Sequence, residues 1–336
     1  MKKVLLIYTG GTIGMASDPE TGKLSPIDLS KILKVIPEIA QFDFEIDTLS
    51  VQTPIDSSEV NPEFWDDLVE MISANYDDYR GFVIMHGTDT MAFTASALSY
   101  ALQGLQKPVV ITGSQLPLGV IRTDGKENLI SAIEIAGTAT NIKEVVVYFE
   151  YQLYRGNRVQ KVSSAHFDAF RSPNYPALAE CGIGIYYNEY LFLQHNKEPK
   201  FQKGFSNELL VITLYPGINL KGWRAILESS SVRAIIIRSF GSGNAPINNQ
   251  YFKEMLKYCE QNQIMVVNSS QCPEGEISAD TYETGNWQKK YGVCSAQNMT
   301  FEATVTKLMF VLHNNKSYTS LCAAFNENLA GEFSIN

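Results

Sequence analysis

The sequence is short of basic residues and long apolar runs, and each shortage excludes a class of protein. No apolar stretch approaches the roughly 18–20 residues that cross a membrane. The apolar run at residues 4–8 is also shorter than the roughly 7–15 apolar residues of a signal peptide. The formal net charge is −9 and the sequence pI is about 5.1. Because binding to phosphate groups requires positive charge, we expect no nucleic-acid partner and no membrane partner.

Metal ligands and reactive cysteine pairs are also scarce. The chain has four widely spaced histidines and five cysteines without a C-x-x-C pair. This odd, scattered set argues against a disulfide framework and against a zinc site. We therefore expect free thiols, no metal and no cofactor in a cytoplasmic protein. The chain also lacks a G-x-S-x-G elbow and an H-E-x-x-H motif, which excludes two common hydrolase arrangements.

The sequence does contain short β-branched runs that alternate with longer helix-like segments. Runs that are apolar on both faces predict parallel strands covered by helices, and the alternation predicts a doubly wound, mostly parallel sheet. The predicted strands are residues 4–8, 82–86, 108–113, 144–149, 209–215, 234–240 and 265–270. The predicted helices are residues 61–76, 90–103, 127–139, 249–262 and 301–314.

The length predicts more than one domain. At 336 residues the chain exceeds the usual size of one domain. Residues 188–208 interrupt the alternating pattern with polar, charged, proline and glycine residues. We therefore predict a larger N-terminal catalytic α/β domain at residues 1–187, a linker at 188–208 and a smaller α/β domain at 209–336.

The first predicted strand ends in the segment TGGTIG at residues 9–14. It has neither the G-x-G-x-x-G spacing of a dinucleotide loop nor the Gly-Lys-Ser/Thr ending of a P-loop. A tight turn without chemistry is one interpretation. The other is that Gly10 and Gly11 let the backbone approach a ligand while Thr12 projects as a reactive hydroxyl. A threonine hydroxyl is a weak nucleophile until a neighbouring base takes its proton, so a partner is required elsewhere in the chain.

The segment HGTDT at residues 86–90 supplies candidate partners. It follows the second predicted strand, and ligands bind beyond the carboxyl ends of parallel strands. One of these residues is expected to cap the following helix, but three consecutive hydroxyl and carboxylate residues exceed that need. Thr88 would hold a second reactive hydroxyl or a water, and Asp89 would bind a cationic group. His86 is more often a structural histidine than a catalytic one at such a strand end.

Two further polar segments are candidates for the same site. Asp56, Ser57 and Ser58 have the composition of an ordinary turn, and they also suit recognition of an amino-acid backbone. Lys161 lies among polar residues, where a solvated lysine is the default interpretation. Only burial or cationic neighbours would make it a base.

These segments together resemble the bacterial-type L-asparaginases. The motifs that carry the resemblance are TGGTIGM, HGTDTMAFTASAL, DSSEVNP, ITGSQLPL with RTDGKENL, LYRGNR, FDAFRSPN, RSFGSGNAP, VVNSSQC and MTFEATVTKL. They cover essentially the whole chain, and the type I, cytoplasmic branch of the family is the most similar.

The resemblance implies roles for individual residues. Thr12 corresponds to the primary nucleophile, and Lys161 to the base that serves Thr88. Asp89 would also hold the substrate α-ammonium. Ser57 and Ser58, with Asp56 beside them, would contact its α-carboxylate end. Asn244 corresponds to a residue that reaches the site of a neighbouring subunit, so a homodimer is implied, commonly doubled to a tetramer.

Two departures from the family pattern concern the nucleophile and a regulatory site. Many members carry a tyrosine in the loop after the nucleophile, whereas this chain has none there and places Lys23 or Leu24 near that position. Some type I enzymes bind asparagine at a second site. Arg238 and Thr300 match residues of that site, but Gln160 stands where threonine is usual. Arg238 also has an ordinary interpretation as a structural arginine at a strand end.

The resemblance implies an asparaginase, an amidohydrolase that converts L-asparagine to L-aspartate and ammonia and prefers asparagine to glutamine. Backbone N–H groups near Thr88, together with Gly11, would receive the oxyanion. Two alternatives remain open on the sequence. One is an asparaginase-like subunit of a tRNA amidotransferase, which releases ammonia for a partner. The other is a non-catalytic amino-acid-binding protein of the same fold.

Overall fold

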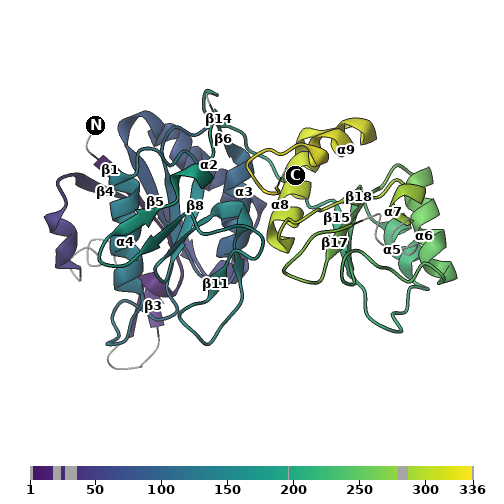
Figure 1. Ribbon diagram of the computed structural model, residues 1–336, viewed down its shortest axis with the longest axis horizontal. Helices are drawn as coiled ribbons and strands as arrows, with labels where there is room; N and C mark the ends of the chain where they lie inside the picture. Colours follow the sequence, from purple (N-terminus) through teal and green to yellow (C-terminus); the bar gives the residue numbers. More distant parts are fainter. Residues whose placement is uncertain (1–2, 18–23, 27–35, 196, 279–286, 335–336) are drawn as a thin grey trace. The chain divides into compact units, whose positions relative to one another are not determined.

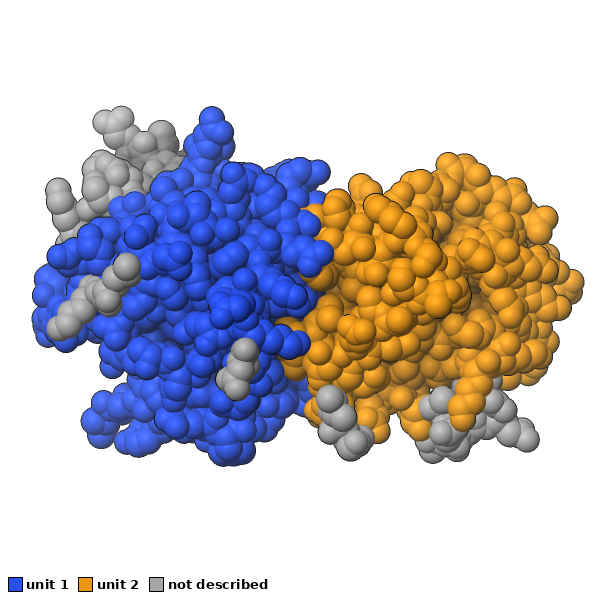
Figure 2. All heavy atoms as spheres, turned by 90° about the horizontal axis from the view of Figure 1, so that it is seen from above, with its two compact units in different colours: residues 1–203 blue, residues 204–336 orange. Residues whose placement is uncertain are grey.

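Two mostly parallel β-sheets, covered by helices, organise the chain (Figure 1). The computed structural model describes residues 3–17, 24–26, 36–195, 197–278 and 287–334. The chain forms two compact units, residues 1–203 and 204–336, which Figure 2 colours blue and orange.

The N-terminal unit is built on an eight-stranded sheet with the order β13-β12-β9-β8-β7-β5-β1-β4. Strands β4, β1, β5, β7 and β8 pair in parallel, whereas β9, β12 and β13 extend the sheet as antiparallel strands. The strands are β1 (Lys3–Gly10), β4 (Glu45–Ile55), β5 (Gly81–Met85), β7 (Val109–Thr112), β8 (Val145–Phe149), β9 (Gln152–Arg155), β12 (Ala179–Cys181) and β13 (Ile185–Tyr187).

Three helices of the described part of the chain pack against this sheet. Helix α4 (Gly125–Thr138) buries Leu129 and Ile133 in one core with strand residues such as Leu6 and Val83. Successive strand residues point to opposite faces, so Phe82 faces the other side, where its ring stacks with Tyr76 at 6.1 Å between centroids. That side carries α2 (Pro62–Asn75) and α3 (Met91–Ala101). Burial of both strand faces explains the continuous apolar sequence of the central strands.

The C-terminal unit repeats the design on a smaller scale. Its four strands pair in parallel in chain order: β15 (Leu209–Thr213), β16 (Ala234–Ser239), β17 (Met265–Ser270) and β18 (Cys294–Ser295). Ile235, Ile237 and Val266 pack in one core with residues of α5 (Trp223–Ser229), α6 (Gln250–Gln261) and α7 (Trp287–Lys290). Helices α8 (Phe301–Asn314) and α9 (Tyr318–Asn326) also contact this sheet.

The predicted fold class is confirmed, and the strand and helix predictions agree with the structure to within a few residues. Four strands of the large sheet were missed: β4, β9, β12 and β13. Strand β4 alternates exposed and half-buried residues at the sheet edge, so it lacks a continuous apolar run. Part of the predicted linker pairs with the N-terminal unit, because β14 (Lys200–Phe201) lies beside β6 (Leu102–Gln103).

In the described part of the chain, no helix combines the length and the apolar character that a membrane span requires.

Candidate active site

Three loops meet at the carboxyl end of β1, and two glycines make the meeting possible. Gly11 has φ of 78°, and a Cβ there would lie only 2.4 Å from the backbone nitrogen of Gly87. A Cβ on Gly87 would in turn lie 2.6 Å from Ser57 Oγ. Because β1 and β5 are adjacent parallel strands, their following loops emerge side by side. The predicted proximity of TGGTIG and HGTDT is therefore confirmed.

Thr12 is the first residue of a 3₁₀ turn, η1 (Thr12–Gly14), and is half-buried. Among the described residues, no group is hydrogen-bonded to its hydroxyl. Behind the turn, the buried Tyr8 hydroxyl donates a hydrogen bond to the carbonyl of Gly14 at 3.0 Å. After η1 the chain forms a ribbon of β2 (Met15–Ser17) and β3 (Leu24–Pro26). Lys23, which stands near the position of the loop tyrosine of other family members, lies outside the described residues.

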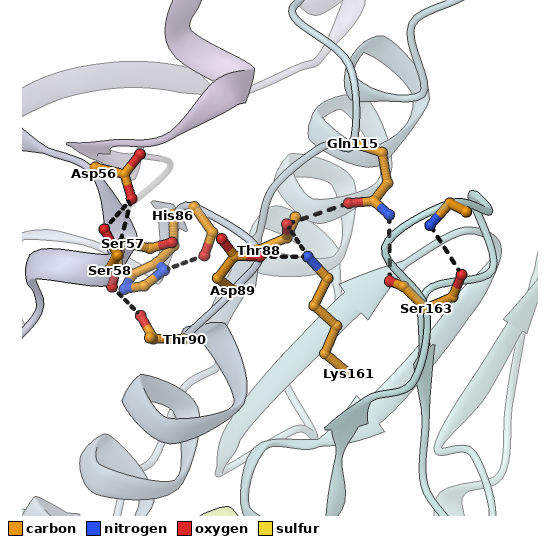
Figure 3. A network of polar contacts seen from close by, with 12 residues as sticks. Asp56, Ser57, Ser58, His86, Thr88, Asp89, Thr90, Gln115, Lys161 and Ser163 are labelled. Atoms are coloured by element: carbon orange, nitrogen blue, oxygen red, sulfur yellow. Dashed lines mark hydrogen bonds and ion pairs between the residues drawn. The ribbon is translucent and has the colours of Figure 1, made fainter.

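Thr88, Asp89 and Lys161 come together although more than 70 residues separate the first two from the third. Lys161 Nζ donates hydrogen bonds to Thr88 Oγ1 and to Asp89 Oδ1, each at 2.7 Å (Figure 3). The Lys161 side chain is 16% exposed and that of Asp89 is 68% exposed. Lys161 lies on β10 (Gln160–Lys161), which pairs with β11 (Phe170–Arg171). The default interpretation of a solvated lysine is therefore wrong.

The turn at residues 56–58 is tied to the same loop. Asp56 Oδ1 accepts hydrogen bonds from the backbone N–H and the hydroxyl of Ser58, both at 2.8 Å. The backbone hydrogen bond is the larger cause of a lowered pKa of Asp56. Ser57 is buried, and its carbonyl accepts a hydrogen bond from the Thr90 hydroxyl at 2.6 Å. Asp56 thus caps the short turn η3 (Ser57–Glu59) and fixes Ser58 against it.

His86 lies beneath this loop and is fully buried. Its Nδ1 lies 2.7 Å from the carbonyl of Gly87, which only accepts, so Nδ1 carries the hydrogen. Nε2 lies 2.9 Å from Thr94 Oγ1, which receives the indole N–H of Trp65. The Thr94 hydroxyl therefore donates to Nε2. Burial lowers the pKa of His86 to about 4, so this histidine is neutral and structural.

Gln115 was not singled out in the sequence, yet its side chain contacts Thr88. Thr88 Oγ1 donates a hydrogen bond to Gln115 Oε1 at 3.2 Å (Figure 3). The sequence signal for this residue was its place after the predicted strand at 108–113, at the sheet edge that carries the other loops. A glutamine in such a loop has no distinctive pattern, and the contact depends on the crossing of distant segments.

The C-terminal unit holds the other predicted residues. The guanidinium of Arg238 lies 4.4 Å from the ring centroid of Phe301, and its Nε is buried without a hydrogen-bond partner among the described atoms. Thr300 caps α8, accepting the N–H of Ala303 at 3.1 Å. The structure thus brings Arg238 next to the turn that contains Thr300. Asn244 lies in a tight loop closed by an antiparallel bridge to Phe240.

No group of three or more His, Cys, Asp or Glu suited to a metal ion occurs in the part of the chain that the structure describes. Gln160, which stands where threonine is usual in the regulatory site, is in the N-terminal unit on β10.

Gly11 was expected to donate to an oxyanion, but its N–H is directed to the carbonyl of Ile55 at 3.3 Å. The Thr88 N–H has no acceptor among the described residues.

Two family models match the chain. Residues 3–192 match the model described as Asparaginase, N-terminal, and residues 209–325 match the Glutaminase/Asparaginase C-terminal domain. The chain therefore belongs to the asparaginase family, as its motifs indicated.

Individual relatives cover nearly the whole chain. It is 42% identical to L-asparaginase 1 of Escherichia coli strain K12, over 98% of both proteins. It is similar to the crystal structure of L-asparaginase I from Vibrio cholerae, with 37% identity and a TM-score of 0.89 over 99% of both chains. It is also 32% identical to a component of the Glutamyl-tRNA(Gln) amidotransferase of Saccharolobus islandicus, over 98% of this chain and 76% of that protein.

Proposed function

We propose that the protein is an L-asparaginase, which hydrolyses the side-chain amide of L-asparagine to L-aspartate and ammonia. The observation that carries this proposal is the contact of Lys161 Nζ with both Thr88 Oγ1 and Asp89 Oδ1. A hydroxyl, an amine and a carboxylate within hydrogen-bond reach supply a proton relay, its base and the group that orients the base, which serve the acyl transfer through Thr12. The E. coli relative, which is named an L-asparaginase, supports the same reaction.

In the first step, Thr12 Oγ1 attacks the amide carbon of the substrate and forms an aspartyl ester. The proton that the Thr12 hydroxyl loses is taken up by the substrate nitrogen, so the carbon–nitrogen bond breaks and the nitrogen leaves as ammonia. The negative charge that develops on the amide oxygen needs a fixed donor, and the Thr88 N–H is available for it. One such donor is often worth about 10²–10³ in rate.

In the second step, water attacks the ester and releases L-aspartate. Lys161 in its neutral form accepts the hydroxyl proton of Thr88 while Thr88 takes a proton from the water. The ester oxygen receives this proton back from the Lys161 ammonium through Thr88 and leaves as the hydroxyl of Thr12. The 2.7 Å contact between Lys161 Nζ and Thr88 Oγ1 is the distance that such a transfer requires.

The two ends of the substrate are held by different groups. Asp89 uses one carboxylate oxygen for Lys161, and its other oxygen is proposed to bind the α-ammonium. Ser57 and Ser58 bind the α-carboxylate, and Asp56 holds Ser58 in place. A hydrophobic slot discriminates one methylene by only about 1–3 kcal/mol. Binding both ends adds to this, so we expect asparagine to be preferred to glutamine.

The working unit is proposed to be a cytoplasmic homodimer or homotetramer. In it, the C-terminal unit contributes to the subunit interface and Asn244 of one subunit completes the site of another. We expect no cofactor to take part. Most soluble oligomers are closed symmetric assemblies of one chain, which is consistent with this arrangement.

Arg238 and Thr300 are proposed to bind asparagine at a second, regulatory site. The buried Nε of Arg238 has no hydrogen-bond partner among the described atoms, so this guanidinium has a donor to offer a carboxylate. Sigmoidal dependence of rate on asparagine concentration, abolished in Arg238→Ala, is the expected result. Hyperbolic kinetics in the unmodified enzyme would remove this part of the proposal.

The deciding experiment is an ammonia-release assay on asparagine, with glutamine beside it. The unmodified protein should release ammonia from asparagine, and Thr12→Ala and Lys161→Met should each lower kcat by about 10³-fold or more. Ammonia from glutamine only in the presence of a partner protein would favour the amidotransferase subunit. Binding of asparagine without ammonia release would favour the amino-acid-binding protein.

A further inference from the structure

The side chain of Gln115 connects Thr88 to the turn at residues 163–166. Gln115 follows β7, and its backbone is anchored by the buried Asp124, which accepts the N–H groups of Gln115 and Leu116 at 2.9 Å and 3.1 Å. Its amide nitrogen donates to the carbonyls of Ser163 and His166 at 3.4 Å and 3.0 Å. Backbone and side chain are therefore both held in place.

The oxygen and the nitrogen of the Gln115 side-chain amide cannot exchange places. Carbonyl oxygens only accept hydrogen bonds, so the NH₂ group must face Ser163 and His166. The turn that presents these carbonyls is itself fixed, because Ser163 Oγ accepts the N–H groups of Ala165 and His166 at 3.1 Å and 3.0 Å. Oε1 of Gln115 is thus directed at Thr88 Oγ1, where it accepts a hydrogen bond (Figure 3).

The directions of these hydrogen bonds fix the orientation of the Thr88 hydroxyl while Lys161 is charged. An ammonium has three donors and no acceptor, so Lys161 donates to Thr88 Oγ1. The single hydrogen of the Thr88 hydroxyl then goes to Gln115 Oε1. Successive hydrogen bonds polarise one another, so the acceptor on Gln115 strengthens the contact between the ammonium and the hydroxyl. To give its proton to Lys161, the hydroxyl must turn away from Gln115.

We propose that Gln115 is a positioning residue that holds the Thr88 hydroxyl hydrogen away from Lys161 until the base is neutral. This inference rests on the proposed function, in which neutral Lys161 accepts that proton. The charged groups around the contact are Lys161 and Asp89 on one side. On the other side, Asp124 lies behind Gln115 and is occupied by backbone N–H groups.

The test is the pH profile of kcat/KM for asparagine in Gln115→Met, which keeps the length of the side chain and removes its acceptor. Without that acceptor, the state in which Lys161 is an ammonium loses one stabilising hydrogen bond. The acid limb of the profile should therefore move to lower pH by about half a unit to one unit, the size of one net hydrogen bond. A role limited to bracing the turn at 163–166 would lower activity at every pH and leave the limb in place.

Gln106→Met is the matched control, because Gln106 also donates its amide nitrogen to two backbone carbonyls, those of Gly104 and Lys197. Its acid limb should coincide with that of the unmodified protein. Gln115→Glu offers a stronger acceptor and adds negative charge, so its limb should move to higher pH. This second variant keeps the test decisive if Gln115→Met does not fold.

If the acid limb of the pH profile is unchanged in the folded Gln115 variants, the inference is overturned. An equal shift of the acid limb in Gln106→Met also overturns it. Failure of the proposed function looks different, because the unmodified protein would then release no ammonia from asparagine. Loss of activity in Lys161→Met together with unmoved limbs in the Gln115 variants would retain the proposed function and reject the role of Gln115 alone.

Discussion

His86 shows how a residue close to the chemistry can be excluded from it by its surroundings. It follows β5 and stands two residues before Thr88, and the sequence favoured a structural role for it over a catalytic one. Its two nitrogens are both satisfied inside the protein, and burial lowers its pKa to about 4. It therefore carries no proton to exchange near neutral pH, and any pH dependence of the rate there must come from other groups.

The same residue makes stability depend on pH. The unfolded pKa of histidine is about 6.5, above the folded pKa of about 4, so the unfolded chain binds the proton more readily. Stability is full above the unfolded value and is lost as pH falls through the interval between the two. We expect the free energy of unfolding to fall by about 2 kcal/mol more between pH 7 and pH 5 than in His86→Gln. Urea unfolding at both pH values measures this, and equal losses in both proteins would contradict it.

Asp56 is expected to act on substrate binding through Ser58. Removing the carboxylate in Asp56→Ala frees the Ser58 hydroxyl and N–H, at a cost of about 1 kcal/mol for a lost cap. KM for asparagine should rise about 5-fold while kcat stays within about twofold. Steady-state kinetics checks this, with Glu59→Ala, in the same turn, as the control. A fall in kcat at unchanged KM would show that Asp56 acts on the chemical step instead.

At the scale of elements, the central strands and the long helices were predictable because burial determines their composition. Strands such as β5 are apolar on both faces, and α8 has the periodicity of a core helix. Edge strand β4 and the antiparallel strands β9, β12 and β13 were not, since half-exposed strands have mixed composition. The contact of Lys161 with Thr88 was not derivable either, because it depends on where β10 lies. Only the resemblance to a family joined those residues.

The glycine crossing, where Gly11 meets Gly87, is the element-scale feature most sensitive to change. In Gly11→Ala the new methyl group would meet the backbone of Gly87 at 2.4 Å, in a backbone conformation that disfavours alanine. We expect kcat/KM to fall by about 10²-fold or more, because a displacement of about 1 Å has that effect. Gly119→Ala is the control, since a Cβ there meets nothing within 4 Å. Activity of Gly11→Ala close to that of the control would refute the tight crossing.

At the scale of the whole molecule, the C-terminal unit contains an ion pair with no exposure to solvent. Lys307 Nζ on α8 contacts Glu332 Oε1 at 2.5 Å, and both side chains are 0% exposed. Burial lowers the pKa of Lys307, and Glu332 opposes that effect. Glu332 also accepts the N–H groups of Leu329 and Ala330, so the pair fastens the segment after α9.

Breaking this pair from one side leaves a buried charge without its partner. We expect Glu332→Ala to lower the free energy of unfolding by about 3–5 kcal/mol. The double substitution Lys307→Met with Glu332→Leu should recover part of the loss, because it removes the unpaired charge but leaves the N–H groups of Leu329 and Ala330 without their acceptor. Urea unfolding measured by tryptophan fluorescence compares the three proteins. A loss below about 1 kcal/mol in Glu332→Ala would contradict the burial of the pair.

Shared sites between subunits can be tested by mixing two inactive chains. If Asn244 serves the site of a neighbouring subunit, a dimer of Thr12→Ala with Asn244→Ala contains one complete site. Random pairing makes half of the dimers mixed, so coexpression should restore about a quarter of the unmodified activity. Each variant expressed alone is the control. Absence of recovery in mixed dimers, identified by two different tags, would reject the shared site.

The hydrogen bond from His86 Nδ1 to the carbonyl of Gly87 has a consequence on the other side of the same peptide group. A trans peptide is planar, and its C=O and N–H point in opposite directions. An imidazole that binds the Gly87 oxygen therefore turns the Thr88 N–H away from itself. The Gly87 carbonyl and the Thr88 N–H rotate together because they belong to one planar peptide group. The ¹⁵N signal of the Thr88 amide therefore becomes a spectroscopic reporter of the buried histidine.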